Sequence, residues 1–314
     1  MFKFGKIKAS PFWGGRKLVL TLGIGIPILL IAIVFVRSSV SVQNISFVVS
    51  NSVPKYFPYS FIVAGHTYGS HSGKNPGLYT KFYQHLSSKF LRSESVDFIV
   101  LTGDIVRESD QKSWDTVGQQ MENLGLPYFF VMGNHDISNY GIEVFKSLYR
   151  NTFYSFSILT DLYIILDSQQ KSRSISEPQL KFVKSTLKKN RHAKRIFIFF
   201  HELLWNSAPE YQQVLSNGRS RYQNIQESNY WTDLHPMFSD YPDKLFYVIA
   251  GDVGGNSDAI SVFHDAKGNV TLIASGMGEV EDENFVVATA LEDAVTFRLI
   301  PLNPGVQLEP LDYY

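Results

Sequence analysis

The residues best suited to chemistry follow short apolar segments of the chain. Five such segments end in a turn with side chains able to bind a metal ion: AGHTYG with His66 and Tyr68, TGDIV with Asp104, MGNHD with Asn134 and His135, FHE with His201, and AGDVGG with Asp252. Ligands of α/β sheets bind beyond the carboxyl ends of the strands, so we expect these side chains to converge. Such oxygen and nitrogen donors favour a hard or borderline divalent ion, such as Mn, Fe, Zn or Mg.

Each of these motifs, taken alone, has an ordinary structural explanation. A Gly-Asp pair after a strand is typical of a turn closed by an Asx hydrogen bond, and GDVGG is typical of a flexible turn. A single histidine after a strand is more often hydrogen-bonded than metal-bound. The sequence GNHD is more specific, since a turn has little need for Asn and His together. Their joint occurrence favours a metal site. The chain has 0 cysteines, so its ligands must be His, Asp, Glu, Asn or Tyr.

The apolar segments alternate with helical patterns, which predicts an α/β fold. Strand-length segments lie at 61–64, 98–101, 128–131, 162–166, 196–200 and 245–250. Helical spacing of apolar residues occurs at Leu78, Phe82, Leu86 and Phe90, and again at Trp114, Val117, Met121 and Leu124. Ser176 is expected to cap a further helix. A helix-poor, meander-like end is predicted from short strands at 260–264, 270–274, 285–290 and 295–299.

Residues 18–36 form an apolar segment without a charge. As a helix the segment would span about 28 Å, which is enough to cross a bilayer. Basic residues precede it while only Arg37 follows closely, so the positive-inside rule predicts a cytoplasmic N-terminus and an extracytoplasmic remainder, periplasmic in a bacterium. A cleaved signal peptide is the alternative, but the segment exceeds a typical h-region and FVRSSVSV lacks an A-x-A site. We therefore expect a single-pass membrane protein held by a signal-anchor.

The predicted organisation is a basic cytoplasmic tail at 1–17, a transmembrane anchor at 18–36, a linker at 37–58 and one domain at 59–314. The 314 residues suffice for an anchor and one large α/β domain, and a hydrophobic content of 44% indicates a packed interior. Lys+Arg and Asp+Glu are equal at 29 each. With no net field to attract a polynucleotide, no nucleic acid partner is expected, whereas the lipid bilayer is an expected partner through residues 18–36.

The order of these motifs resembles the calcineurin-like metallophosphoesterase superfamily. The resemblance runs from about residue 61 to residue 255 and rests on GDIV, GNHD, the strand-ending His201 and the final glycine-rich motif. It implies a four-layer α/β/β/α sandwich of two mixed sheets, with a two-metal site on loops at the strand ends. It also implies a hydrolase that cleaves a phosphate ester through a metal-activated hydroxide.

Four residues match the motifs of this superfamily. The resemblance implies that Asp104 is the carboxylate that bridges both metal ions, and that Asn134 and His201 are ligands of one of them. His135 would be the histidine that sits beside the scissile phosphate and helps to protonate the leaving group. His135 and Asp104 are therefore the expected catalytic residues.

The first and fifth motifs depart from the superfamily pattern. His66 stands where the superfamily has aspartate and Tyr68 where it has histidine, while Asp252 and Gly254 replace two histidines. The half-site of Asp104, Asn134 and His201 would gain Asp252, which keeps an acceptable set of donors. The other half-site would rely on His66 and Tyr68, and tyrosine binds a metal well only as phenolate. The exchanges at 66 and 252 also fit a reciprocal swap, so one or two divalent ions are expected.

Two functional hypotheses remain. The first is a membrane-anchored, extracytoplasmic metal-dependent phosphoesterase that acts on a phosphorylated small molecule, lipid or glycan. The second is a catalytically impaired relative that serves as a metal-binding or assembly module at the membrane. The intact motif residues favour metal binding, whereas the changes at 66, 68 and 254 favour reduced catalysis. His71 and His235 are further histidines that could replace a lost ligand.

Overall fold

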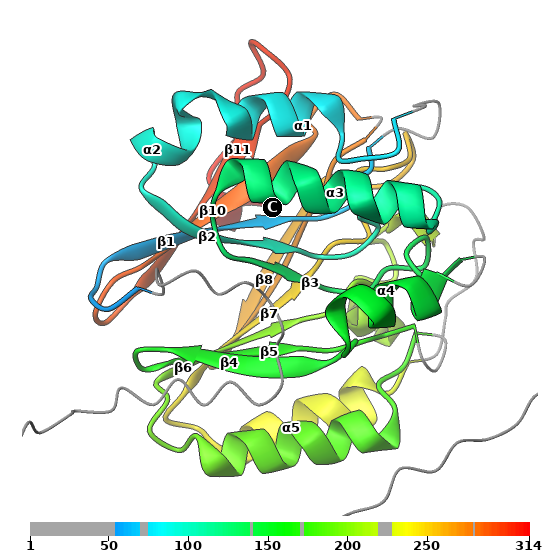
Figure 1. Cartoon of the computed structure of the whole chain (residues 1–314). Coiled ribbons are helices and arrows are strands. Elements are labelled where there is room, and N and C mark those ends of the chain that lie inside the picture. The colour runs from blue at the N-terminus through cyan, green and yellow to red at the C-terminus, as the bar shows by residue number, and fades with distance from the viewer. Residues whose placement is uncertain (1–53, 70–74, 139–140, 170–172, 219–227, 279) are drawn as a thin grey trace, which may run out of the picture. The chain divides into compact units, whose positions relative to one another are not determined.

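A computed structural model describes residues 54–69, 75–138, 141–169, 173–218, 228–278 and 280–314 (Figure 1). The predicted cytoplasmic tail, the predicted anchor at 18–36 and most of the predicted linker lie outside these ranges. Within them, no helix has both the length and the apolar character needed to cross a membrane. The first strand begins at Tyr59.

Two mixed sheets form the centre of the fold. The five-stranded sheet has the order β11-β10-β1-β2-β3, with β1 to β3 parallel and β10 and β11 antiparallel to their neighbours. The six-stranded sheet has the order β4-β5-β6-β7-β9-β8, in which β5, β6, β7 and β9 are parallel. The strands are β1 (Tyr59–Ala64), β2 (Val96–Leu101), β3 (Tyr128–Phe130), β4 (Tyr154–Ile158), β5 (Asp161–Ile165), β6 (Arg195–Phe199), β7 (Leu245–Ala250), β8 (Val262–Lys267), β9 (Val270–Ser275), β10 (Asn284–Ala290) and β11 (Val295–Pro301).

Helices cover the outer faces of both sheets, as Figure 1 shows for α1 to α3 on one side and α5 on the other. One apolar cluster lies between the five-stranded sheet and its helices, a second between the two sheets, and a third between the six-stranded sheet and α5. The predicted α/β arrangement of two mixed sheets with flanking helices is therefore confirmed. The helices are α1 (Thr80–His85), α2 (Leu91–Ser93), α3 (Gln111–Leu124), α4 (Gly141–Tyr149) and α5 (Glu177–Lys189), with short turns at η1 (Leu86–Phe90), η3 (Leu204–Ser207), η4 (Pro209–Tyr211), η5 (Tyr230–Leu234), η6 (His235–Asp240) and η7 (Leu311–Tyr313).

Aromatic residues of the inner strands hold the two sheets together. Phe61 of β1 stacks on Phe98 of β2 with ring centroids 4.8 Å apart, and meets the edge of Phe197 of β6 at 5.4 Å. Such strands are buried on both faces, which explains why they read as continuous apolar runs rather than as alternating ones. Aromatic pairs in these geometries are favourable beyond their burial. The inter-sheet core thus fixes the strand ends that carry the polar turns.

The helix ends follow their local sequence. Asp110 caps α3 by accepting a hydrogen bond from the Ser113 N–H at 2.7 Å, and Gly125 ends the helix in the left-handed conformation. Ser176 occupies the N-cap of α5 as predicted, but its side chain accepts from the Gln179 amide instead of from a backbone N–H. The same Gln179 amide donates to the Asp167 carbonyl at 2.8 Å, so α5 is tied to the loop after β5.

The four strands predicted for the helix-poor C-terminal end are present, but the prediction that they form a meander is wrong. The last strands form two antiparallel pairs that join different sheets, since β8 and β9 extend the six-stranded sheet whereas β10 and β11 pair beside β1. Strand β4 was missed, although its burial alternates along YSFSI as in a half-exposed strand. Short alternating segments of this kind are hard to separate from loops without knowledge of their partner strand.

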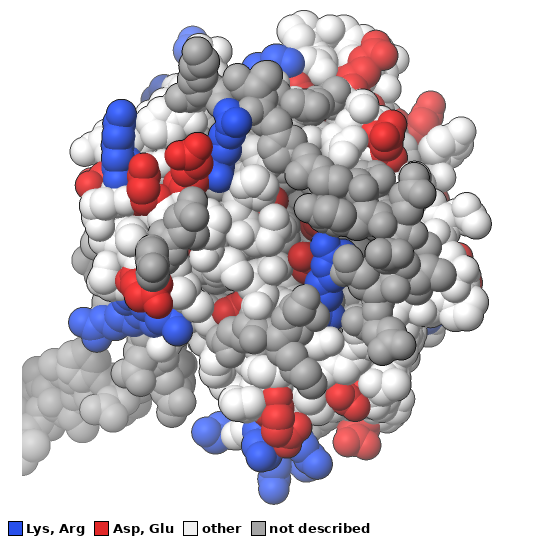
Figure 2. All heavy atoms as spheres, turned by 90° about the vertical axis from the view of Figure 1, so that its right-hand side faces the viewer, with Lys and Arg blue, Asp and Glu red and all other residues white. Residues whose placement is uncertain are grey.

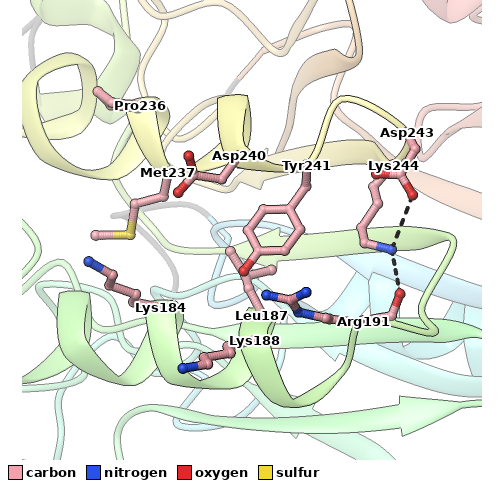
Figure 3. A pocket seen from close by; sticks show the side chains of 10 residues that line it. All are labelled: Lys184, Leu187, Lys188, Arg191, Pro236, Met237, Asp240, Tyr241, Asp243 and Lys244. Atoms are coloured by element: carbon pink, nitrogen blue, oxygen red, sulfur yellow. Dashed lines mark hydrogen bonds and ion pairs between the residues drawn. The ribbon is translucent and has the colours of Figure 1, made fainter.

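A cavity of about 790 Å³ lies between the end of α5 and η6 (Figure 3). Lys184, Lys188 and Arg191 line one side, and Met237 and Tyr241 line the other. Lys244, which also lines it, directly precedes β7, and Arg191 lies shortly before β6. The cavity is therefore near the start of the two strands whose other ends carry His201 and Asp252.

Candidate metal centre

Asp104 sits in a turn that the sequence Thr-Gly-Asp builds directly after β2. Gly103 and Asp104 have φ values of +91° and +52°, a left-handed pair that only glycine and short polar residues adopt readily. A Cβ on Gly103 would lie 2.4 Å from the ring nitrogen Nδ1 of His201. The glycine is therefore required for the approach of the His201 imidazole to Asp104.

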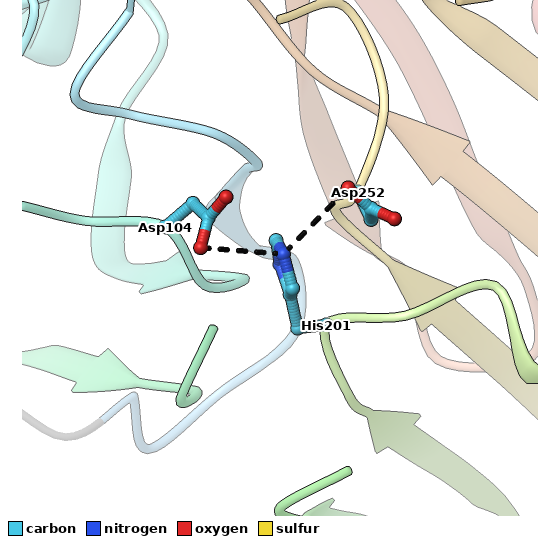
Figure 4. Close-up of side chains that lie close together, drawn as sticks. All are labelled: Asp104, His201 and Asp252. Carbon is cyan, nitrogen blue, oxygen red and sulfur yellow. Dashed lines mark ion pairs between the residues drawn. The ribbon is translucent and has the colours of Figure 1, made fainter. Parts of the chain in front are cut away.

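Asp104, His201 and Asp252 converge from three different turns, with His201 between the two carboxylates (Figure 4). His201 Nε2 lies 3.4 Å from Asp104 Oδ1 and 3.8 Å from Asp252 Oδ1. One ligand atom from each residue lies within 4.8 Å of the others, and all three side chains are buried. The fold thus brings together residues that are 148 positions apart at the extremes, 104 and 252.

The donor set fits a divalent ion. His201 Nδ1 lies 2.9 Å from the Thr102 carbonyl oxygen, so in the neutral ring Nδ1 carries the hydrogen and the lone pair of Nε2 points to the carboxylates. Nε2 is buried and has no hydrogen-bond partner among the described residues. Two ligands about 2.1 Å from a shared ion lie roughly 3 to 4 Å apart, as these atoms do. A buried lone pair facing two carboxylates is satisfied by a cation.

The pKa values of the triad show how the same residues behave without an ion. Burial acts to lower the pKa of His201, but the carboxylates of Asp104 and Asp252 raise it well above its ordinary value. Burial acts to raise the pKa of Asp104, yet His201 and the other nearby imidazoles lower it. Burial and Glu202 raise the pKa of Asp252 well above its ordinary value. A metal ion that binds the triad therefore has to displace protons from it.

His66 faces the second oxygen of Asp104. Its Nε2 lies 3.8 Å from Asp104 Oδ2, whereas His201 faces Oδ1. His66 Nδ1 lies 2.9 Å from the Met277 carbonyl oxygen, so Nε2 again presents a lone pair. Burial lowers the pKa of His66 to about 4, so the ring is neutral at pH 7. The two imidazoles thus face different oxygens of the Asp104 carboxylate. A carboxylate that bridges two metal ions has its ligands arranged in this way.

Gly255 leaves the space that the His66 ring fills. A Cβ at this position would lie 2.1 Å from His66 Cε1. The neighbouring Gly254, which stands where the superfamily has a histidine, supplies no side chain, and the imidazole of His66 comes from the first motif instead.

Tyr68 and His135 lie beside His66. The Tyr68 ring centroid is 4.2 Å from that of His66 and 4.7 Å from that of His135. The Tyr68 hydroxyl lies 3.3 Å from His135 Nε2, and His135 Nδ1 lies 2.9 Å from the Arg107 carbonyl oxygen. With Nδ1 as the donor to that carbonyl, Nε2 accepts from the Tyr68 hydroxyl. Tyr68 therefore contacts the expected general acid as well as the expected metal ligand.

Asp136 organises the GNHD turn, a role the sequence alone did not assign. Its carboxylate accepts hydrogen bonds from the backbone N–H groups of Ile105, Val106 and Gly133 at 2.8 to 3.0 Å. Burial and the nearby Asp104 raise the pKa of Asp136 to about 6, while these N–H groups act in the opposite direction. The bonds hold the turn so that the His135 N–H donates to Asp104 Oδ1 at 3.0 Å.

The remaining predicted ligands are placed differently. Asn134 lies in the same turn with an exposed side chain. His235 begins η6 and packs on Trp231 with ring centroids 4.8 Å apart, so it belongs to an aromatic cluster over the six-stranded sheet. His71 lies outside the described residues. Arg173 and Glu202, which sequence reasoning did not single out, lie beside Asp252, and Glu202 follows His201 directly. The sequence signal that could have identified Glu202 was its position directly after His201 in the FHE motif.

The comparisons with known proteins bear on the same part of the chain. Residues 59–276 match the calcineurin-like phosphoesterase family, which is more than half of the chain and includes every residue of the triad. The chain belongs to the calcineurin-like phosphoesterase family. The resemblance drawn from the motifs is confirmed, and divalent metal binding is a property of this family.

Two individual proteins illustrate the relationship. The 3',5'-cyclic adenosine monophosphate phosphodiesterase CpdA of Haemophilus influenzae is 28% identical over 160 residues, which cover 48% of this chain and 58% of that protein. The purple acid phosphatase PPD1 from yellow lupin seeds superposes with a TM-score of 0.56 at 13% identity, over 81% of this chain and 53% of that one. The match thus spans less than two thirds of either protein, and the lupin structure supports the fold alone.

Proposed function

We propose that this protein is a metal-dependent phosphoesterase. The observation that carries the proposal is the buried triad of Asp104, His201 and Asp252, in which His201 Nε2 faces two carboxylates and has no hydrogen-bond partner in the described part of the chain. A divalent ion held there would supply a Lewis acid and an activated water at neutral pH. Membership of the phosphoesterase family supports the same reaction class.

The protein's own residues have separate roles in this proposal. Asp104, His201 and Asp252 would hold the first ion, with Asn134 as a further ligand from the exposed side of the turn. Asp104 and His66 would hold a second ion, because the His66 imidazole faces the other oxygen of the Asp104 carboxylate. His135 lies at the partly open edge of the site and is the proposed proton donor to the leaving group. Manganese, iron, zinc and magnesium all suit these donors.

The proposed substrate is a phosphate ester of a small molecule, a lipid or a glycan. The relative from Haemophilus influenzae is named as a cyclic nucleotide phosphodiesterase, which supports testing phosphodiesters alongside monoesters. Figure 2 shows the face toward which β1 to β3 run. Where this face is described, acidic and basic side chains are interspersed, and a basic group lies beside an acidic one near the middle of the view.

The test is hydrolysis by the purified protein after reconstitution with each metal. We expect release of aryl alcohol from an aryl phosphate mono- or diester with Mn, and a requirement for Asp104. An Asp104→Asn variant that retains full activity would assign the hydrolysis to a contaminant. A protein that binds metal but cleaves no monoester, diester or 3',5'-cyclic nucleotide would instead support the alternative of a metal-binding or assembly module.

We further propose that residues 18–36 anchor the domain to a membrane, with the N-terminus in the cytoplasm and the domain outside it. The support is the uncharged apolar run and the basic residues before it. The full-length protein should stay with membranes in alkaline carbonate and should be digested by protease added to the outer side, for a bacterium the periplasmic side of spheroplasts. Release into the carbonate supernatant would contradict the anchor.

A further inference from the structure

Arg173 lies in the loop between β5 and α5, next to the metal centre. Its backbone N–H donates to the Ser168 carbonyl at 3.0 Å, which fixes the loop. Its Nε lies 3.6 Å from Glu202 Oε2, and the Arg173 and Glu202 side chains are only 21% and 5% exposed. Glu202 directly follows the metal ligand His201 in the chain. The guanidinium is therefore held on its Nε side by a buried carboxylate.

Glu202 is itself held in place. Its Oε1 accepts a hydrogen bond from the Gln169 side-chain amide at 3.2 Å, and its backbone N–H donates to the Ser168 hydroxyl at 3.4 Å. Since Ser168 also accepts the Arg173 backbone N–H, one short segment fixes both members of the ion pair. A buried pair fixed in this way gives the guanidinium a defined position.

The other edge of the guanidinium lies against Gly218. A Cβ on Gly218 would lie 2.4 Å from Nη2 and 3.1 Å from Nη1 of Arg173. The Gly218 N–H donates to Asp252 Oδ2 at 3.3 Å. One residue therefore touches both the guanidinium and the carboxylate of a metal ligand, which places Arg173 at the edge of the triad.

The terminal nitrogens of Arg173 donate no hydrogen bond within the part of the chain that the structure describes. A guanidinium has five N–H donors in a planar fork that matches the oxygens of a phosphate, and leaving them unused while largely buried is unfavourable. Since Glu202 engages the Nε side, the terminal N–H groups are left to bind an anion.

We propose that Arg173 binds phosphate oxygens of the substrate at the metal centre and that Glu202 positions it. This inference rests on the proposed function, because it names how that site recognises its substrate. The ligand class is a phosphate group with at least one anionic oxygen, bound by the terminal N–H groups of the guanidinium, which donate to none of the described residues. A mere charge-balancing role beside Asp252 and Glu202 would not require the fork of an arginine.

The test uses the full-length protein loaded with Mn and freed of excess metal. Inorganic phosphate is titrated calorimetrically into the parent protein and into Arg173→Gln, with metal content and thermal midpoint measured on each. We expect Arg173→Gln to bind phosphate about 10- to 100-fold more weakly at unchanged metal content, as for loss of hydrogen bonds to a charged group. Arg191→Gln, which removes the same charge at the cavity near the opposite ends of β6 and β7, should bind like the parent.

Two further variants separate binding from structure. Arg173→Lys keeps the charge without the fork and should fall between the parent and Arg173→Gln. If Glu202 acts through Arg173, Glu202→Gln should raise KM while leaving kcat unchanged, and the double variant should bind phosphate no more weakly than Arg173→Gln alone. Unchanged phosphate affinity in Arg173→Gln, loss of metal from it, or no phosphate binding by the parent would each overturn the inference. If phosphate binding depends on Arg173 but no ester is hydrolysed, the result would contradict only the proposed catalytic function.

Discussion

His66 Nε2 lies 3.8 Å from Oδ2 of Asp104, on the opposite side of the carboxylate from the oxygen that faces His201. A cation between the lone pair of a neutral imidazole and a carboxylate oxygen is attracted to both. This relationship supports a rebuilt second metal position, in which a histidine from the first motif replaces the usual aspartate.

We expect His66→Ala to lower the metal content of the protein by one ion per chain. The substitution removes the His66 imidazole, whose Nε2 faces Asp104 Oδ2. These two atoms are the proposed donors to the second ion. Elemental analysis after dialysis against Mn or Zn measures the stoichiometry. His235→Ala, which removes a histidine of the aromatic cluster around Trp231, is the matched control and should keep the parent stoichiometry. If His66→Ala has the same metal content as the parent, the loop at 66–68 does not bind a metal ion.

Asp104→Asn should abolish metal binding and lower hydrolysis by at least about 100-fold. The amide keeps the shape of the side chain, but it removes the charge that both imidazoles face. Asp97→Asn is the control, because Asp97 is a half-buried carboxylate on β2 that accepts a hydrogen bond from the Ser60 N–H at 2.9 Å. Metal content and Mn-dependent rate are measured together. Full metal loading in Asp104→Asn would contradict the proposed bridging role.

Metal binding should release protons, and metal affinity should fall as the pH falls. The metal-free site holds protons because the pKa of His201 is raised by Asp104 and Asp252, and because burial and Glu202 raise that of Asp252. At pH 7 an ion has to displace at least the His201 proton, so affinity drops about tenfold per pH unit for each proton released. Calorimetry in buffers of different ionisation enthalpy counts the protons. Binding without proton release at pH 7 would be inconsistent with this coupling.

Asp136→Asn should weaken both the fold and the metal centre. The two oxygens of the carboxylate accept three backbone N–H groups from two turns. The amide nitrogen that replaces one of these oxygens in asparagine cannot accept a hydrogen bond. We expect a loss of about 1 to 3 kcal/mol in the free energy of unfolding and about 10- to 100-fold in metal affinity. Urea titration and metal competition measure the two effects. Asp115→Asn, at an exposed carboxylate on α3, should change neither.

Arg195→Met tests the buried ion pair at the far end of the strands. Arg195 donates to both oxygens of Asp161 at 2.6 and 2.8 Å, and Tyr59 donates to the same carboxylate at 2.5 Å. Removing the arginine leaves a buried carboxylate without its cation, so we expect a loss of about 3 to 5 kcal/mol in the free energy of unfolding. Arg298→Met, at an exposed pair with Glu94, should cost under about 1 kcal/mol. Equal losses in urea titration would contradict the burial argument.

The sequence by itself determined the family and most of the strands. Apolar runs of strand length, each followed by a polar turn, place their side chains at one sheet edge whatever the details of packing. That is why the sequence alone identifies Asp104, His201 and Asp252 as candidate ligands, and why the triad is built from turns after β2, β6 and β7. Gly103 and Gly255 belong to the same local patterns, and their positions allow two imidazoles to approach.

Only the tertiary structure decided which atoms face which. The orientation of His66 toward Oδ2 depends on the Met277 carbonyl, 211 residues away, and the position of Arg173 depends on Glu202 and Gly218 from two other loops. The division of the last strands between two sheets likewise depends on pairing with β1 and β7. Local patterns reflect the periodicity of one segment, whereas tautomers, bridging geometry and sheet order arise from contacts between segments distant in the chain.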